Sequence, residues 1–340
     1  MGLGKRNVVT PDLKNYVTLI LGEPKIGKTT LAKNIIKEIT GTSDKILMAE
    51  LGGETGFEAI DGLIYEAPQN QSELDITIDE FLEGGHDFEF FAIDTINELC
   101  KFTDEQTLKD HHRQNGEVAS SVNACFGGYG SGAKHSYGIS ESIIDRFKLS
   151  PYGLILIGHN KVKSETKEGG EKYDVVTSDL FSNYYSAFSK KATLICNIIT
   201  DTSVEEDKLN GSVRMMYFRS NNFVKAGSRF EVIQEKAEYG AKNFVEVFKN
   251  AVRDSKDDAT RDTDKFDKVK NTPSESMTNS KTLDEYIKEI TDTTLEVQDE
   301  IEGANSKIMK VLKDNDINNP NKIQDKELAK KVLAELSKLV

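Results

Sequence analysis

The amino-acid sequence predicts an α/β fold, in which a mostly parallel central sheet is flanked by helices, followed by a small helical C-terminal region. Apolar runs of strand type alternate with amphipathic segments of helical period from residue 16 to residue 252. Such alternation is typical of right-handed strand–helix–strand crossovers, which build parallel sheets covered on both faces. A glycine-rich turn joins the first strand to the first helix, and a charged, polar segment separates this region from a second helical pattern.

The same pattern divides the chain of 340 residues into four predicted parts. Residues 1–15 form a polar lead-in, 16–252 the α/β domain, 253–280 a flexible linker, and 281–340 a helical domain. The formal net charge of -13 argues against a generally basic surface, so any contact with nucleic acid must be local.

Cysteine usage and hydropathy exclude several classes of protein. The three cysteines lie far apart without a C-x-x-C pair, so the chain encodes neither a disulfide framework nor a zinc ribbon. No run of 18 apolar residues occurs, and we expect no membrane span. The N-terminus lacks the apolar core of a signal peptide. We therefore expect a soluble cytoplasmic protein.

The turn after the first strand reads G-x-x-x-x-G-K-T over Gly22–Thr29. A β-branched run at 16–21 precedes it and a helical face at 30–39 follows, which is the context that a phosphate-binding P-loop requires. In such a loop Lys28 contacts the β- and γ-phosphates and Thr29 places its hydroxyl on Mg²⁺, while backbone N–H groups bind phosphate oxygens. The alternative is a glycine-rich turn that carries Lys-Thr by chance. The predicted nucleotide-binding residues are Gly22, Glu23, Pro24, Lys25, Ile26, Gly27, Lys28, Thr29 and Thr30.

Further elements follow from apolar runs and the breaks between them. The most apolar strand, 152–158, is predicted to lie at the centre of the sheet. The charged segment 161–174 is predicted to form a hairpin, and the glycine-rich residues 126–133 a mobile loop. The other predicted strands are 45–50, 62–67, 88–94, 192–200 and 213–220, and the other predicted helices are 71–83, 96–112, 139–148 and 241–252.

Acidic residues at strand ends are the candidates for metal binding and for positioning water. Asp94 ends an apolar strand, where a carboxylate of a P-loop protein holds the Mg²⁺ shell; the alternative is that it caps the next helix. Glu50 ends the strand after the P-loop helix, and Glu54 lies in the glycine loop that follows. Either could position the attacking water, and Glu50 is preferred because a strand end is more rigid than a loop. The alternative for Glu50 is a surface glutamate at the sheet edge.

A histidine follows the predicted central strand. His159 and Asn160 would face the crevice at the carboxyl ends of the strands, where ligands bind in open α/β sheets. There His159 could sense the γ-phosphate and relay its state to residues 161–174. A solvated turn residue is an equally good reading of its position.

Cations are distributed unevenly in the second half of the α/β domain. Within 161–174 four lysines are balanced by four acids, so the basic signal is weak. The stretch from Lys208 to Phe230 has five cations, interleaved aromatic residues and no acid, which indicates a phosphate-facing surface. The alternative is a strand whose aromatic residues are buried and whose cations extend to solvent. The five cations are Lys208, Arg214, Arg219, Lys225 and Arg229.

Together these residues resemble RecA-type P-loop ATPases. The resemblance rests on GxxxxGKTT, on the strand ending in Glu50 before a glycine loop, and on the sequence AIDTINEL at 92–99. The sequence LIGHNK at 156–161, with the later K-x-x-x-R-F at 225–230, is similar to phage nucleotide-binding proteins of the RecA-like single-strand annealing group. The resemblance covers about residues 15–250.

The resemblance implies a Mg²⁺-dependent ATPase with ATP as its cofactor. Asp94 and Thr29 would hold the metal, and Lys28, Glu50 and His159 would be catalytic. Lys225 and Arg229 would complete the catalytic set by approaching a nucleotide across a subunit interface, which implies a homo-oligomer. The implied partners are single-stranded DNA and a phage single-strand-binding protein, in the cytoplasm of an infected or lysogenic bacterium. The segment after His159 departs from the family pattern because it is not net basic.

Two other functions share parts of this sequence pattern. A helicase or helicase loader of phage DNA replication has the same RecA-type core. A small-molecule kinase also carries GxxxxGK[ST], but usually adds an arginine-rich lid, and the only arginines between residues 30 and 210 are Arg113 and Arg146. We therefore rank the kinase last.

The C-terminal region has a different periodicity. Apolar residues from Leu283 to Val311 alternate spacings of four and three, which is typical of a coiled-coil seam, although Gly303 interrupts it. A final helix is predicted from Asp325 to Val340. This region could mediate oligomerisation or bind a partner, and a helical hairpin packed on itself is as good a reading.

Overall fold

The computed structural model divides the chain into two compact units, Met1–Thr263 and Asp264–Val340. In the first unit it describes residues 8–52, 56–166, 170, 172–205 and 208–256. In the second it describes residues 287, 290–291, 294, 304–315, 317, 323, 328–329, 331–332 and 336. Glu54 and nearly all of the predicted linker at 253–280 lie outside the described residues.

A ten-stranded sheet forms the centre of the first unit, with the order β10-β8-β7-β1-β5-β4-β2-β3. Strands β7, β1, β5, β4, β2 and β3 run parallel, and antiparallel strands β8 and β10 extend one side. Strand β6 pairs with β5, and β9 with β7, both antiparallel. The strands are β1 (Thr18–Gly22), β2 (Ile46–Glu50), β3 (Tyr65–Glu66), β4 (Phe90–Asp94), β5 (Gly153–Thr166), β6 (Lys172–Ser178), β7 (Leu194–Glu205), β8 (Lys208–Tyr217), β9 (Gly227–Ser228) and β10 (Lys236–Glu238).

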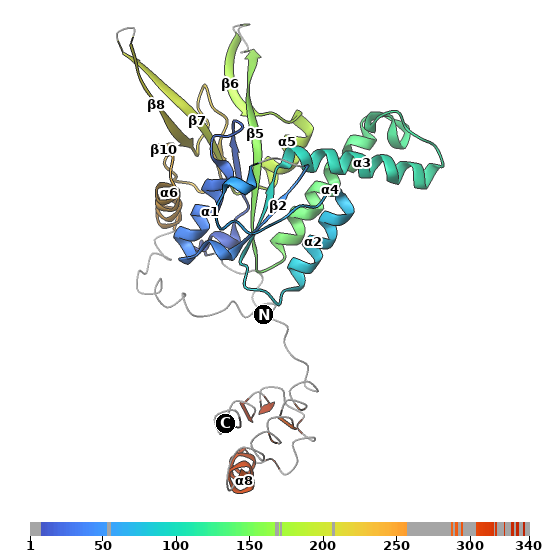
Figure 1. Cartoon of the computed structure of the whole chain (residues 1–340), viewed down its shortest axis with the longest axis vertical. Coiled ribbons are helices and arrows are strands. Elements are labelled where there is room, and N and C mark those ends of the chain that lie inside the picture. Colours follow the sequence, from blue (N-terminus) through green and yellow to red (C-terminus); the bar gives the residue numbers. More distant parts are fainter. Residues whose placement is uncertain are drawn as a thin grey trace. The chain divides into compact units, whose positions relative to one another are not determined.

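Helices cover both faces of this sheet (Figure 1). Helices α1 and α6 pack on one face, with buried side chains such as Ile35 and Phe248. Helices α2, α3, α4 and α5 pack on the other, with buried side chains such as Phe81 and Phe147. The predicted α/β fold is thus confirmed. The helices are α1 (Lys28–Thr40), α2 (Gln71–Glu83), α3 (Ile96–Asn115), α4 (Ser131–Lys148), α5 (Ser182–Lys191) and α6 (Ala241–Asp254), with short 3₁₀ turns η1 (Leu13–Asn15), η2 (Ser43–Lys45), η3 (Phe57–Ala59) and η4 (Val122–Gly127).

Strand β5 lies between β1 and β4, in the interior of the sheet. Its first half is apolar and buried on both faces, as expected for a central parallel strand. The strand does not end at residue 158, as the apolar run predicts, but continues to Thr166 as one arm of an antiparallel hairpin with β6. The polar second half can extend because β6 supplies its backbone hydrogen bonds.

Two hairpins project from the same edge of the sheet in Figure 1, β5–β6 and β7–β8. The sequence predicts one strand at 192–200 and another at 213–220, whereas the structure joins longer strands directly as a hairpin. Both hairpins leave the edge at which β1 and β4 end and at which β5 stops pairing with them.

Helix α4 begins at Ser131, well before the predicted start at residue 139. The glycine-rich segment that was expected to be a mobile loop therefore contains the end of η4 and the first turn of this helix. Gly132 lies so close to η4 that a Cβ atom on it would be 1.8 Å from the carbonyl oxygen of Val122. Glycine here allows close packing of two elements, and not a loop.

The second unit contains helix α8 (Ala304–Asp314). Ile308 and Leu312 of this helix are buried in a separate apolar cluster with Ile290, Val332 and Leu336. Three of the six seam positions before residue 304 lie outside the described residues, namely Leu283, Val297 and Ile301, so the coiled-coil prediction remains untested. None of the helices that the structure describes combines the length and apolar character required to span a bilayer.

Candidate nucleotide site

The P-loop connects the end of β1 to the start of α1. Gly27 precedes the helix with a φ of 102° and makes no side-chain cap to it, and the N-terminus of a helix is a favourable place for an anion. Lys25 also has a positive φ, of 65°. Ile26 is buried in the core beneath α1 and anchors the loop. The loop thus has the left-handed turns and the uncapped helix start that suit phosphate binding.

Lys28 and His159 meet at this loop, as the sequence predicts for a site at the carboxyl ends of the strands. The Lys28 ammonium is buried and donates to the carbonyl of Glu23 at 2.9 Å. The same ammonium lies 3.3 Å from Nδ1 of His159. Because an ammonium group can only donate, Nδ1 accepts and the ring proton lies on Nε2. His159 is therefore part of the P-loop site and not a solvated turn residue.

Asp94 and Thr29 also lie together, although β4 and α1 are far apart in the sequence. The Thr29 hydroxyl donates to Oδ2 of Asp94 at 2.6 Å, and the Asp94 side chain is buried. Asp94 does not cap α3, because Thr95 is the N-cap and accepts from the N–H of Glu98. Buried carboxylate and hydroxyl oxygens at one point suit Mg²⁺, which prefers hard oxygen ligands.

These two residues fit the metal site of a P-loop protein in number as well as in chemistry. Among the residues that the structure describes, no group of three or more His, Cys, Asp and Glu side chains could hold a metal on its own. Mg²⁺ bound with a nucleotide needs only one or two protein ligands, because phosphate oxygens and waters supply the rest. Thr29 and Asp94 would therefore hold it.

Glu50 lies beside this pair. It ends β2, opposite Asp94 in the parallel register of β2 and β4, and its side chain is half-buried. A carboxylate beside the metal ligands, and still reached by water, is suited to positioning a water molecule. The preference for Glu50 over Glu54 stays a prediction, because Glu54 lies outside the described residues.

Three asparagines fix the strands around His159, and the sequence placed only Asn160 of the three at the crevice. Asn97 accepts the backbone N–H of His159 at 2.9 Å. Asn160 donates to Oδ1 of Asn197 at 2.6 Å and to the carbonyl of Ile198 at 3.2 Å. Because β1 lies between β5 and β7, these last bonds cross the end of β1 at the start of the P-loop. Asn197 in turn donates to the carbonyl of Lys225 at 3.0 Å.

Arg214 and Tyr239 contact the P-loop from outside. Arg214 Nη1 donates to the carbonyl of Ile26, and the Tyr239 hydroxyl donates to the carbonyl of Gly27, each at 2.9 Å. Burial raises the pKa of Tyr239, and the nearby Arg214 guanidinium opposes that shift. The sequence pattern indicated Arg214 only as a cation of the stretch from Lys208 to Phe230, which has no acid, and it gave no signal for Tyr239. No short motif connects either residue to the P-loop.

Lys225 and Arg229 do not join the nucleotide site within one subunit. Lys225 lies beside the β5–β6 hairpin, with its ammonium 3.1 Å from Glu165. Arg229 donates through its backbone to Thr193, which itself donates to Val17 just before β1 begins. Its guanidinium donates to the carbonyls of Lys190 and Ala192. Arg229 thus lies at the edge where the parallel strands start, opposite to the P-loop.

The two interpretations of the stretch from Lys208 to Phe230 each fit a different part of it. Tyr217, Phe218 and Phe230 are buried, as expected for core aromatic residues, and Arg219 donates to backbone carbonyls of Phe230 and Glu231. Phe223, in contrast, is 68% exposed. Only this aromatic ring, among those of the stretch, is accessible to a ligand.

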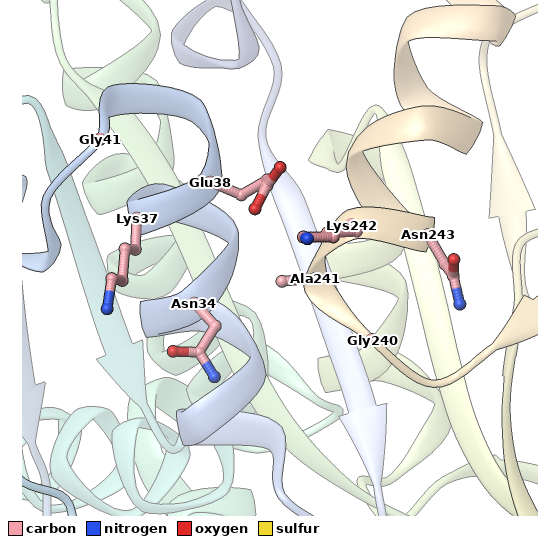
Figure 2. A pocket seen from close by; sticks show the side chains of 8 residues that line it. All are labelled: Asn34, Lys37, Glu38, Gly41, Gly240, Ala241, Lys242 and Asn243. Atoms are coloured by element: carbon pink, nitrogen blue, oxygen red, sulfur yellow. The ribbon is translucent and has the colours of Figure 1, made fainter.

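A groove of about 540 Å³ lies between α1 and the start of α6 (Figure 2). Glu38 of α1 and Lys242 of α6 point toward each other across it, and Asn34, Lys37 and Asn243 also line it. None of the predicted site residues lines it. The groove is therefore separate from the phosphate-binding loop.

Comparison with known proteins agrees with this site. A family model described as an AAA domain matches residues 14–230, which is more than half of the chain. The match includes the P-loop and extends past Arg229. No curated protein matches the chain.

Proposed function

The chain belongs to the AAA domain family and is a P-loop ATPase; from this premise we propose that it couples Mg²⁺-dependent ATP hydrolysis to the annealing of single-stranded DNA. The nucleotide would bind with its phosphates on Gly22–Thr30. Lys28 would release the carbonyl of Glu23 and move to the β- and γ-phosphates. Mg²⁺, when held by Thr29 and Asp94, would neutralise charge on the same phosphates.

Hydrolysis needs a water molecule aligned with the γ-phosphate. Glu50 would orient this water from the end of β2, next to Asp94. His159, with its proton on Nε2 and its Nδ1 toward Lys28, would respond to the γ-phosphate through Lys28.

One observation carries the proposed coupling to DNA. Strand β5 runs without interruption from His159 at the P-loop into the β5–β6 hairpin, which projects beyond the sheet (Figure 1). A shift of His159 on loss of the γ-phosphate would therefore be transmitted along one hydrogen-bonded strand. Such a connection suits a protein whose hold on a polymer depends on its nucleotide state.

The region beside this hairpin has features that suit single-stranded DNA. Phe223 is exposed, and its carbonyl accepts the N–H of Val176 in β6. Lys225 lies two residues further on, in a stretch without acids. An exposed aromatic ring beside a cation can stack on a base while the cation binds phosphate. Lys225 would exchange its ion pair with Glu165 for a phosphate, while Lys161 pairs with Asp179 and Lys163 donates to Leu180.

The ATPase rate with and without single-stranded DNA, at two salt concentrations, tests this proposal. We expect stimulation that weakens as salt rises, because phosphate contacts release counterions. Phe223→Ala should reduce the stimulation, whereas Phe181→Ala, also at an exposed phenylalanine, should not. Equal rates with and without DNA at both salt concentrations would contradict the proposal while leaving the ATPase intact.

We also propose the remaining context that the resemblance implies. The protein would act in phage recombination as a homo-oligomer, beside a phage single-strand-binding protein. Arg229 would then act on the nucleotide of a neighbouring subunit, because within its own subunit it lies at the opposite edge.

A helicase or helicase loader is the second candidate, because the same continuous β5 strand would serve a motor. Strand separation of a duplex on ATP addition would favour the motor, and annealing without unwinding the first proposal. A nucleotide kinase has less support. Arg113 contacts Asp110, and Arg146 contacts Asp75 and Asp79, so both arginines are engaged within the helical layer of α2, α3 and α4.

A further inference from the structure

The outward side of the P-loop is held by two residues from the antiparallel end of the sheet. We infer that Arg214 and Tyr239 are positioning residues of the nucleotide site, which fix the loop in the shape that receives phosphate and thereby set the affinity for ATP. The inference rests on the proposed function, because it assigns a role in the binding of the same nucleotide.

A P-loop has to orient its peptide groups in order to bind phosphate. A loop that turns its N–H groups toward phosphate turns its carbonyl oxygens away. Those oxygens need donors, since unpaired peptide groups in a folded protein are costly. Arg214 supplies a donor to Ile26 and Tyr239 supplies one to Gly27, the residue just before Lys28. The two bonds therefore act on the peptide groups that set the direction of the loop.

The two side chains form one unit. The guanidinium carbon of Arg214 lies 4.0 Å from the centre of the Tyr239 ring. The backbone N–H of Tyr239 donates to the carbonyl of Arg214 at 2.8 Å, continuing the pairing of β10 with β8. Stacking holds the planar guanidinium in one orientation, which lysine could not reproduce. The pair is thus preorganised before any nucleotide binds.

Gly27 shows how closely Arg214 and Tyr239 approach the P-loop. A Cβ atom at this position would lie 2.6 Å from the Tyr239 hydroxyl and 3.2 Å from Nη1 of Arg214. The φ of Gly27 favours glycine, and a side chain here would also displace the ends of these two neighbouring side chains.

The contact also joins the P-loop to a projecting element. Arg214 belongs to β8, and therefore to the β7–β8 hairpin that leaves the same edge of the sheet as β5–β6 (Figure 1). A displacement of this hairpin would move Arg214, and with it the carbonyl of Ile26 to which Arg214 donates. The nucleotide site is thus in contact with both hairpins, through His159 on one side and Arg214 on the other.

Conservative variants of the full-length chain test the inference. Tyr239→Phe keeps the ring and removes the hydroxyl. Arg214→Lys keeps the charge and removes the planar guanidinium that stacks on the Tyr239 ring. Tyr217→Phe and Arg219→Lys are matched controls on the same side of the sheet, because neither side chain contacts the P-loop in any hydrogen bond that the structure shows. The readouts are KM and kcat for ATP, equilibrium binding of a fluorescent ATP analogue, and the thermal midpoint without nucleotide.

We expect each test variant to raise KM and the dissociation constant about 3- to 10-fold, the effect of losing one hydrogen bond. The value of kcat should change less than about 2-fold. The lost contacts stabilise bound ATP and the transition state equally, so their loss weakens binding without raising the barrier from the bound state. The double variant should lose less than the product of the two single effects, since the residues act as a unit. Thermal midpoints without nucleotide should match those of the controls.

Two results would overturn the inference. Unchanged KM and binding in both test variants would show that the contacts do not set affinity. A fall in the nucleotide-free thermal midpoint below that of the controls would assign the pair a general structural role. Failure of the wild-type chain to bind or hydrolyse ATP would instead refute the proposed function. The same binding and turnover measurements detect this outcome.

Discussion

The P-loop site and the segment 219–230 both present polar and cationic residues at loops, yet they are built differently. Thr29, Asp94 and His159 lie far apart in the sequence and converge, because β1, β4 and β5 are parallel and end at one edge. Lys225 and Arg229 are only four residues apart and diverge. Their segment crosses the sheet, so Lys225 lies beside Glu165 and Arg229 beside the start of β7.

The difference shows what turns residues into a site. Parallel strands align their carboxyl ends, so one polar residue after each strand is enough to assemble a crevice. A segment that runs across the strands carries neighbouring residues to opposite edges. Closeness in sequence is therefore a weaker guide to a shared site than equivalent positions on different strands.

Lys28→Ala is the strongest test of the P-loop side of this comparison. We expect ATP turnover to fall by about 10²- to 10³-fold or more, because a charge that stabilises the transferring phosphoryl group is lost. Phosphate release at saturating ATP measures it. Lys37→Ala, at an exposed lysine of α1 outside the P-loop, is the control. Wild-type turnover in Lys28→Ala would refute the assignment of the whole site.

Asp94→Asn tests whether strand ends assemble a metal site. We expect turnover to fall by about 10²-fold, with a higher Mg²⁺ concentration needed for half-maximal rate, since a neutral amide is a poor ligand for a hard cation. Nucleotide binding in EDTA should change little. Asp110→Asn, at a buried aspartate of α3, controls for the loss of a buried carboxylate. An unchanged Mg²⁺ requirement would contradict the assignment.

Mixing two inactive variants tests whether Arg229 acts between subunits. Arg229→Ala should still bind ATP but lose hydrolysis, while Lys28→Ala retains Arg229. In an equal mixture, head-to-tail contacts pair an intact P-loop with an intact Arg229 at about a quarter of the interfaces. We expect turnover to recover to about that fraction. A mixture no more active than its separate components would contradict a role across an interface.

Substitution of Glu165 is expected to have the smallest effect on stability. It tests the contact between Lys225 and the β5–β6 hairpin. Hydrogen bonds from Tyr173, and then from Lys225, lower the pKa of the Glu165 carboxyl. A lowered pKa in the folded state stabilises the protein above the ordinary glutamate range, and this contribution is lost as pH falls through the folded pKa. Because the pair is exposed, we expect about 0.5 kcal/mol or less.

The thermal midpoint of wild type and of Glu165→Gln, followed from neutral pH to about pH 3, measures this effect. The difference between the two proteins should shrink as the pH falls. Tyr173→Phe, which removes the first of the two hydrogen bonds, should have part of the effect. A difference that grows on acidification would show that Glu165 is not held by these donors.

The sequence predicted well the elements whose signals are local. The helix predicted at 71–83 matches α2, and the strand ending at Asp94 matches β4 at that end. Prediction was weaker where packing decides. The start of α4 is helical because Gly132 packs on η4, and β5 continues past Gly158 because β6 pairs with it. Neither partner can be read from the segment itself.

The sequence by itself determined the α/β fold and the P-loop with Lys28 and Thr29, because a short motif between a strand and a helix specifies its own geometry. It also indicated Asp94 and His159, since residues after parallel strands share one edge. The tertiary structure alone decided the rest. It placed Arg214 and Tyr239 on the P-loop and Arg229 at the opposite edge, because those positions depend on antiparallel pairing at the side of the sheet, where the sequence carries no comparable periodic signal.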